Sequence, residues 1–302
     1  MSGDRQGALL VTGASGQLGS RVLELLLESH TGPIIAVTRT PEKLAAFKDR
    51  GVLVRYADFD KPESLIEAFA DTDRLLLIST DVVGQGDRRL QQQRNAVVAA
   101  DKAGVTHIVY TSLVNPGPDS PVLLAPDHFG TEAALTASQL GWTVLRENIY
   151  ADVMIFGLVQ AVKIGKLFKA AGDGKAAYIL REDVARASAA ALSALFTGRR
   201  TLDITGPEAL SQVDLAAIAT TITGQQITYV PLELEVLLHN MVDAGIPRPV
   251  AEIYASFDTA IAQGKFSAVS STVEDLTGHK AMNVREYLTT HPEILLQGVP
   301  QS

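Results

Sequence analysis

The chain has 302 residues, a hydrophobic content of 46%, a charged content of 20% and a net charge of −8 at pH 7. This composition is typical of a globular protein with one large domain or two joined ones, and the negative charge disfavours an extended nucleic-acid surface. The absence of cysteine excludes disulfides, thiolate catalysis and thiolate metal sites. The polar start and the lack of an 18-residue apolar run predict a cytoplasmic protein without a secretory leader or membrane span.

The first half of the chain alternates short apolar runs with helical patterns. The apolar runs, which predict buried strands, occupy residues 8–11, 34–38, 52–57, 75–78, 107–111 and 142–145. Helical patterns lie between them, over residues 17–27, 41–48, 62–69, 88–103 and 127–140, and we expect the last two to end at Gly104 and Gly141. Continuous apolar strands separated by helices predict the α/β class, with a Rossmann-type doubly wound parallel sheet covered on both faces.

The pattern changes after residue 150. Helical spacing dominates residues 183–196, 213–221, 232–243 and 249–263, and short strands are predicted only near residues 176–179, 201–205 and 227–230. We therefore predict a Rossmann domain over residues 1–150. A smaller, mostly helical substrate-binding lobe is expected over residues 151–302, with some of its elements returning to the first domain.

A glycine turn follows the first predicted strand. Gly13 permits a sharp turn off the strand, Gly16 lets backbone N–H groups approach a pyrophosphate, and Gly19 lets the next helix pack closely. The phosphates then lie at the positive end of the helix that begins near Gln17. The turn predicts a dinucleotide site that consists of Gly13, Ser15, Gly16, Gln17, Leu18 and Gly19.

The residue after the second strand indicates which dinucleotide is preferred. An acidic side chain there bonds the ribose 2′-hydroxyl of NAD, whereas an arginine suits the 2′-phosphate of NADP. This chain has Arg39 at that place and no acidic residue before Glu42. Because a guanidinium pairs bidentately with phosphate, we predict NADPH rather than NADH as the cofactor. The alternative is that Arg39 is an ordinary surface charge.

The ends of the next strands predict further contacts with the cofactor. After the third strand, Asp58 can accept from the adenine amino group and Phe59 can lie along the ring, while for Asp60 we favour an N-cap of the helix at Pro62. The fourth strand ends at Ile78, Ser79 and Thr80, where small residues allow the nicotinamide ribose to approach. The fifth strand ends at Thr111 and Ser112, beside the expected position of the nicotinamide.

Several segments together resemble one known family. They are Thr12–Gly19, Leu76–Ser79, Gln92–Asn95, Ala103–Val105, Tyr110–Leu113 and Ala170–Lys175. The combination resembles the NmrA-like atypical short-chain dehydrogenases, in the branch of type 2 NAD(P)H:quinone oxidoreductases and triphenylmethane reductases, from residue 8 to near Thr289. The resemblance implies a Rossmann domain with a small C-terminal domain, NADPH as hydride donor, and quinone-like or cationic dye acceptors.

The chain departs from the short-chain dehydrogenase pattern at the proton donor. Those enzymes usually use a Tyr with a Lys four residues later, but none of the seven tyrosines here is followed by such a Lys. The Tyr and the Lys would fall within residues 128–133, and in this chain apolar residues occupy both of their positions. No histidine pair has metal-ligand spacing, so no metal site is expected. His128 alone is expected near the cleft, as a proton donor or as a capping or surface histidine.

An acceptor reduced without a strong proton donor must itself stabilise the added electron pair, as quinones and triarylmethyl cations do. We therefore predict an NADPH-dependent reductase that transfers hydride directly to a quinone or similar conjugated electrophile. Ser112 is the candidate to bond the acceptor oxygen, and Tyr150 is the candidate to line the pocket. Two alternatives stay open, an imine or activated-carbonyl reductase and a non-catalytic, NADP-binding redox sensor of NmrA type. The expected partner is a small molecule, and a homodimer is compatible with the fold.

Overall fold

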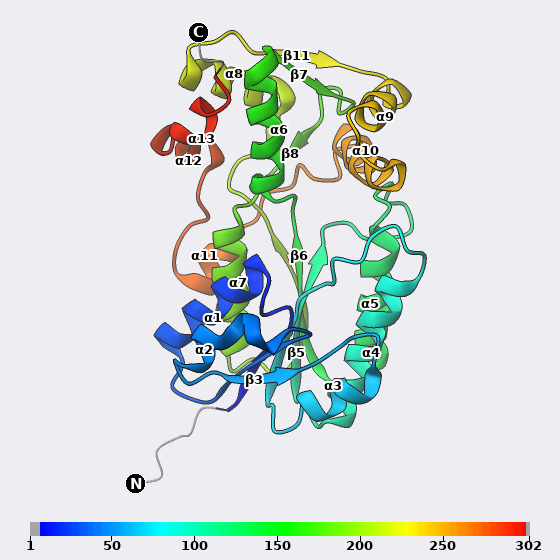
Figure 1. Cartoon of the computed structure of the whole chain (residues 1–302), viewed down its shortest axis with the longest axis vertical. Coiled ribbons are helices and arrows are strands. Elements are labelled where there is room, and N and C mark those ends of the chain that lie inside the picture. The colour runs from blue at the N-terminus through cyan, green and yellow to red at the C-terminus, as the bar shows by residue number, and fades with distance from the viewer. Residues whose placement is uncertain (1–6, 300–302) are drawn as a thin grey trace. The chain divides into compact units, whose positions relative to one another are not determined.

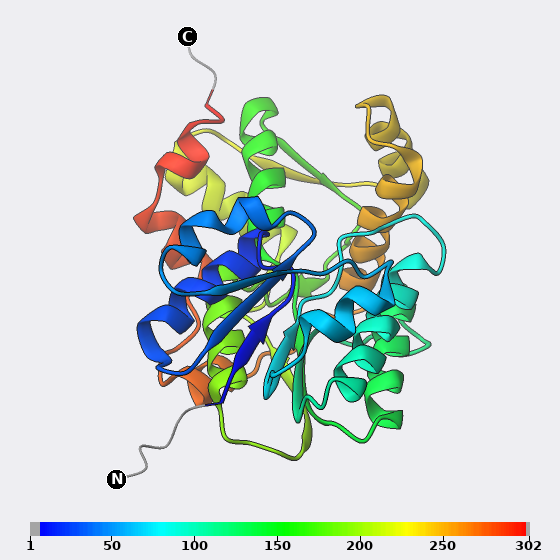
Figure 2. The same cartoon turned by 60° about the horizontal axis from the view of Figure 1, so that its bottom comes forward.

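A computed structural model describes residues 7–299, which divide into two compact units (Figures 1 and 2). The first unit holds the chain through Leu113, Asp127–Arg146 and Val184–Leu202, and the second holds Val114–Pro126, Glu147–Asp183 and the chain from Asp203 onward. The polypeptide therefore passes between the units several times.

A seven-stranded sheet forms the centre of the first unit, in the order β3-β2-β1-β4-β5-β6-β9. Its strands are β1 (Leu9–Val11), β2 (Ile34–Thr38), β3 (Leu53–Tyr56), β4 (Arg74–Leu77), β5 (His107–Leu113), β6 (Gly141–Glu147) and β9 (Arg199–Ile204). β1 pairs in parallel with β2 and β4, β2 with β3, and β4 with β5. This order is that of a doubly wound Rossmann fold, and the predicted fold class is confirmed.

Helices cover both faces of the sheet, which is why β1, β2 and β5 are buried along their whole length (Figure 1). α1 (Gln17–Ser29) and α7 (Arg181–Ser193) lie on one side, and α3 (Pro62–Ala68), α4 (Arg88–Lys102) and α5 (Ala125–Ala137) lie on the other. Between β2 and β3, a 3-10 turn (η1, Pro41–Leu44) precedes the short α2 (Ala45–Lys48), where we predicted one helix.

Arg74 on β4 holds the end of α7. Its guanidinium donates from Nε to the carbonyl of Leu192 at 2.7 Å, from Nη1 to Phe196 at 2.8 Å and from Nη2 to Ala191 at 3.2 Å. The last carbonyls of a helix have no partner within it, and a cation there satisfies them and complements the helix dipole. An early strand and a helix more than a hundred residues later thereby belong to one folding unit.

The two glycines predicted to end helices behave differently. Gly104 lies just after α4 with a φ of +79°, as expected for a helix C-terminus. Gly141 does not cap α5, because that helix ends at Ala137 and Gly141 is the first residue of β6. A Cβ at Gly141 would lie 2.5 Å from the carbonyl oxygen of Thr197, so glycine is required here by close backbone packing.

The second unit is mostly helical, as predicted. Its helices are α6 (Ala151–Ile164), α8 (Gln212–Thr223), α9 (Leu234–Asp243), α10 (Arg248–Ala262), α11 (Thr272–Thr277), α12 (Val284–Thr290) and α13 (Glu293–Leu296). Two short sheets accompany them: β7 (Lys166–Lys169) pairs in parallel with β11 (Thr228–Pro231), and β8 (Lys175–Ala176) pairs antiparallel with β10 (Leu210–Ser211). Within residues 7–299, none of the helices has the length and apolar character needed to cross a membrane.

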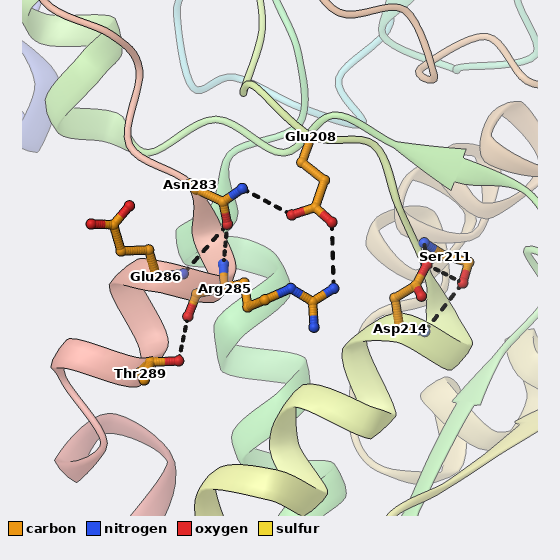
Figure 3. A network of polar contacts seen from close by, with 7 residues as sticks. All are labelled: Glu208, Ser211, Asp214, Asn283, Arg285, Glu286 and Thr289. Carbon is orange, nitrogen blue, oxygen red and sulfur yellow. Dashed lines mark hydrogen bonds and ion pairs between the residues drawn. The ribbon is translucent and has the colours of Figure 1, made fainter.

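Side-chain caps define two of these helices (Figure 3). Ser211 and Asp214 form a reciprocal capping box at the start of α8. At the start of α12, Asn283 accepts from the N–H groups of Arg285 and Glu286 and donates from its amide to Glu208 at 2.9 Å. These local bonds explain why polar residues interrupt the helical patterns at residues 211 and 283.

Candidate active site

The glycine turn joins β1 to α1 and is open to solvent. Gly13 has a φ of +58°, a conformation that favours glycine. Gly13, Ser15, Gly16 and Gln17 are exposed, and α1 begins at Gln17 without any side chain capping its first amides. The positive end of a 13-residue helix is thus free to meet an anion.

Close packing explains the third glycine of the turn. A Cβ at Gly19 would lie 2.4 Å from the carbonyl oxygen of Gly13 and 2.8 Å from Cα of Ala14. At Gly16, a Cβ would lie 3.2 Å from the same carbonyl oxygen. The first turn of α1 therefore rests directly on the backbone of the glycine turn, and only glycine fits at residue 19.

The turn is tied to the end of β2, where Arg39 lies. Ser15 Oγ is 3.0 Å from Thr38 Oγ1, and the N–H of Ala14 donates to the carbonyl of Val37 at 3.4 Å. Arg39 follows directly, is exposed, and makes no hydrogen bond or ion pair with any other residue in the described part of the chain. Its guanidinium is therefore available to a phosphate beside the glycine turn.

The residues after β3 correct one expectation. Asp60 does not cap α3, whose N-cap residue is Lys61. Instead Asp60 accepts from Arg88 Nη2 at 2.6 Å and from Gln92 Nε2 at 3.0 Å. These two hydrogen bonds, the one from Arg88 first, lower the pKa of Asp60 to about 2. The N-cap interpretation is wrong because a long-range ion pair competes for the same carboxylate.

Asp58 and Phe59 take different positions after the same strand. Asp58 Oδ1 accepts from the N–H of Asp60 at 3.1 Å, and the side chain remains partly exposed. Phe59 packs against the buried cluster beneath the sheet and is also only partly buried. Their contacts with an adenine ring stay predictions.

Two buried threonines hold the segment that follows β4. Thr12 Oγ1 accepts from the N–H of Ile78 at 2.9 Å, and Thr111 Oγ1 accepts from the N–H of Ser79 at 2.8 Å. Ile78 borders the glycine turn, since a Cβ at Gly13 would lie 3.5 Å from it. The hydroxyl of Thr80 is buried without a hydrogen-bond partner. An unsatisfied hydroxyl at this place suits a ribose hydroxyl.

A buried chain of hydrogen bonds runs from Thr80 to Gln93. Arg89 donates from Nε to the carbonyl of Thr80 at 2.8 Å, and its Nη2 lies 3.1 Å from Nε2 of His128. Because a guanidinium has only donors, Nε2 must accept, and Nδ1 of His128 then donates to Tyr110 Oη at 3.0 Å. Tyr110 in turn donates to Gln93 at 2.8 Å.

This arrangement settles the role of His128. Burial, followed by the charge of Arg89, lowers its pKa well below the ordinary value, so the imidazole is neutral. With 6% exposure, His128 is neither a surface nor a capping histidine, and its only ring proton is given to Tyr110. We assign it a structural role in positioning Arg89.

Replacing His128 with leucine is expected to lower the free energy of unfolding by about 2–4 kcal/mol, because the buried Arg89 guanidinium loses a hydrogen-bond acceptor. Urea denaturation followed by circular dichroism measures this change. His279→Leu, at an exposed histidine, is the matched control and should leave the urea midpoint within error. Equal midpoints for His128→Leu and the wild type would contradict this role.

Ser112 at the end of β5 is committed to a neighbouring carboxylate. Its hydroxyl donates to Glu132 Oε1 at 2.6 Å, and Arg146 donates to both oxygens of Glu132, at 3.0 and 2.6 Å. The hydroxyl proton of Ser112 is therefore engaged, while its oxygen keeps lone pairs for a ligand donor. Glu132 was not among the sequence candidates, because its partners lie 20 and 14 residues away.

Tyr150 follows β6 and is the N-cap residue of α6. Its hydroxyl donates to Glu147, the last residue of β6, at 2.5 Å. The guanidinium carbon of Arg181 lies 5.6 Å from the centre of the Tyr150 ring. Glu147 is a second carboxylate that the sequence analysis did not single out.

The first unit fits a dinucleotide cofactor. An uncapped helix start, an exposed glycine turn that side chains would fill, an unpaired Arg39 and the unsatisfied hydroxyl of Thr80 supply groups for phosphates and riboses. The turn residues Ser15 to Gly19 would hold the pyrophosphate, and Arg39 would hold a 2′-phosphate. Thr80 would face a ribose.

Comparisons with known proteins agree with this fit. Residues 13–194 match a family model described as NAD(P)H-binding. The chain is 34% identical to quinone oxidoreductase 2 of Escherichia coli over 279 residues, which cover 92% of this chain and 96% of that protein.

Two solved structures are similar over nearly the whole chain. The NADPH complex of an NADPH-dependent quinone oxidoreductase from Escherichia coli has a TM-score of 0.88 and 34% identity, covering 94% of this chain and 99% of that one. The NADP(H) complex of Citrobacter sp. triphenylmethane reductase has a TM-score of 0.86 and 32% identity, covering 96% of this chain and 100% of that one. The resemblance inferred from the sequence motifs is confirmed, and the chain belongs to the NAD(P)H-binding family.

Proposed function

We propose that this protein is an NADPH-dependent reductase that transfers hydride directly to a quinone or a similar conjugated electrophile. The observation that carries the proposal is the open glycine turn at the uncapped start of α1, with the unpaired Arg39 beside it. The similarity to a quinone oxidoreductase over 92% of the chain supports the acceptor class.

The choice of acceptor follows from the side chains at the strand ends. When bound, NADPH supplies the hydride, and the protein must orient the acceptor and manage the proton. The Ser112 hydroxyl donates its hydrogen bond to Glu132, so we propose that its oxygen orients the nicotinamide by accepting a hydrogen bond. We propose Tyr150 as the hydroxyl that meets the acceptor oxygen. Quinones and triarylmethyl cations suit such a site because hydride addition converts each into a stable product: an aromatic hydroquinone anion from a quinone, and a neutral molecule from the cation.

The first experiment measures NADPH consumption at 340 nm with menadione and with the dye crystal violet, beside NADPH binding by fluorescence. Turnover with either acceptor and purified, flavin-free protein is the expected result. Tight NADPH binding without turnover of these acceptors or of a panel of imines would overturn the proposal and favour a redox-sensing regulator. Turnover of imines alone would identify the imine reductase alternative.

The remaining predictions about partners and location accompany this function. The acidic chain, with a net charge of −8, is proposed to act on small molecules in the cytoplasm and not on nucleic acid. A homodimer stays a prediction, which the mass from light scattering would test.

A further inference from the structure

A buried carboxyl group lies directly behind Tyr150. Glu147 is 5% exposed, and its Oε2 accepts from the Tyr150 hydroxyl at 2.5 Å. Its other oxygen, Oε1, is buried and has no hydrogen-bond partner. A carboxylate offers about four lone-pair sites, and burying one with a single partner is costly. The surroundings therefore favour the neutral acid.

The charges around the pair agree with a protonated Glu147. Burial raises the pKa of Glu147 to about 8, opposed only in part by the hydrogen bond from Tyr150. The charged groups that face Tyr150 are Arg181 and Asp152, and these two pair with each other at 2.8 Å. The guanidinium is thus already neutralised by Asp152, and the buried, partnerless Oε1 favours the neutral form of Glu147.

The protonation state of Glu147 determines which of the two groups, Glu147 or Tyr150, can be the donor in the hydrogen bond between them. An ionised Glu147 can only accept, and the Tyr150 proton is then held inside the pair. A neutral Glu147 can instead donate its own O–H to Tyr150 Oη, and the phenolic proton would then be free to go to another acceptor. Burial raises the pKa of Tyr150 well above its ordinary value. A tyrosine in this environment resists becoming a phenolate unless it is reprotonated at once.

We infer that Glu147 is a positioning residue that stores the proton which Tyr150 delivers to the reduced quinone. The inference rests on the proposed function. Hydride addition brings two electrons to the quinone and leaves an anionic oxygen. The Tyr150 O–H bond breaks as the new O–H bond forms on that oxygen, and the Glu147 proton moves to Tyr150 Oη. Glu147 is left as a carboxylate, which regains a proton from water before the next turnover.

Two acceptors of different proton demand separate this role from a structural one. Reduction of menadione to its hydroquinone requires a proton, whereas hydride addition to the crystal violet cation gives a neutral product without one. We expect Glu147→Gln to lower the ratio of menadione to crystal violet turnover at pH 7 by about 10- to 100-fold. Tyr150→Phe should lower the same ratio by a similar factor. Glu235→Gln, at an exposed glutamate of α9, is the matched control and should keep the wild-type ratio.

The pH profile supplies a second readout. Because the neutral acid is the active form, kcat for menadione in the wild type should fall as the pH rises through about 8. This alkaline limb should be absent in Glu147→Gln, whose amide does not titrate. An unchanged acceptor ratio together with an unchanged pH profile in Glu147→Gln would overturn the inference. Failure of the wild type to reduce either acceptor would instead overturn the proposed function, and the inference with it.

Discussion

Replacing Gly19 with alanine is expected to raise the Kd for NADPH by more than about 30-fold, which corresponds to roughly 2 kcal/mol. The added Cβ would lie 2.4 Å from the carbonyl oxygen of Gly13. This obstacle is backbone and cannot rotate away, so α1 must move off the glycine turn. Overpacking of this kind also costs about 1–3 kcal/mol of stability. Fluorescence titration with NADPH and urea denaturation measure the two effects.

Gly157 provides the matched control, because it also lies within a helix. A Cβ at Gly157 meets nothing within 4 Å, so Gly157→Ala should leave NADPH affinity unchanged. Alanine should also stabilise α6 by up to about 1 kcal/mol through its higher helix propensity. If Gly19→Ala bound NADPH as tightly as Gly157→Ala, close packing would not be the reason for the third glycine.

Charge reversal at Arg39 is expected to weaken NADPH binding by about 100-fold or more, that is by roughly 3 kcal/mol. The substitution Arg39→Glu removes a charge-assisted hydrogen bond to the 2′-phosphate and adds repulsion against it. NADH has no such phosphate, and a glutamate there can bond its ribose hydroxyl. The Kd of the variant for NADH should therefore stay unchanged or fall. The Kd values of both cofactors, measured by fluorescence, give the preference directly.

A control variant separates this local effect from a change in net charge. Lys48→Glu alters the net charge by the same amount at another exposed position of the first unit. It should weaken NADPH binding less than about threefold at physiological salt, because solvent and salt screen a charge that makes no direct contact with the phosphate. If Arg39→Glu changed the affinities for NADPH and NADH by the same factor, Arg39 would not bind the 2′-phosphate.

The parallel sheet and the glycine turn were predictable because they depend on short-range patterns. Strands covered on both faces are buried throughout and mainly apolar, as Ile34–Thr38 is, and that run was assigned with its observed bounds. The glycine turn combines a strand, three spaced glycines and a helix within about 20 residues, and each glycine has a local steric reason.

The helix α6 was not predicted, for a reason visible in its residues. The stretch Ala151–Ile164 is apolar around most of its circumference, so it lacks the alternation that identifies a surface helix. Gly157 and β-branched residues such as Val153 and Ile155 further lower its helix propensity. Its start at Ala151, with Tyr150 as the N-cap residue, became apparent only from the structure.

The polar partnerships of the site were beyond sequence reasoning because they join distant residues. Asp60 pairs with Arg88, 28 residues later, and Arg89 contacts His128, 39 residues later. Local rules favoured an N-cap for Asp60 and left the role of His128 open. Glu147 and Tyr150 are only three residues apart, yet the importance of Glu147 depends on burial, which no local pattern shows.

Each compact unit is built from separated segments of the chain, and this constrains how the protein folds while it is being synthesised. On the ribosome, β6 emerges well before β9, which completes the sheet beside it only when residue 204 has been made. Until then β6 is an open edge strand. The guanidinium of Arg74 likewise lacks its acceptors until the chain has been made through residue 196. A nascent chain that ends near residue 150 therefore lacks a strand of the sheet and is not a finished domain.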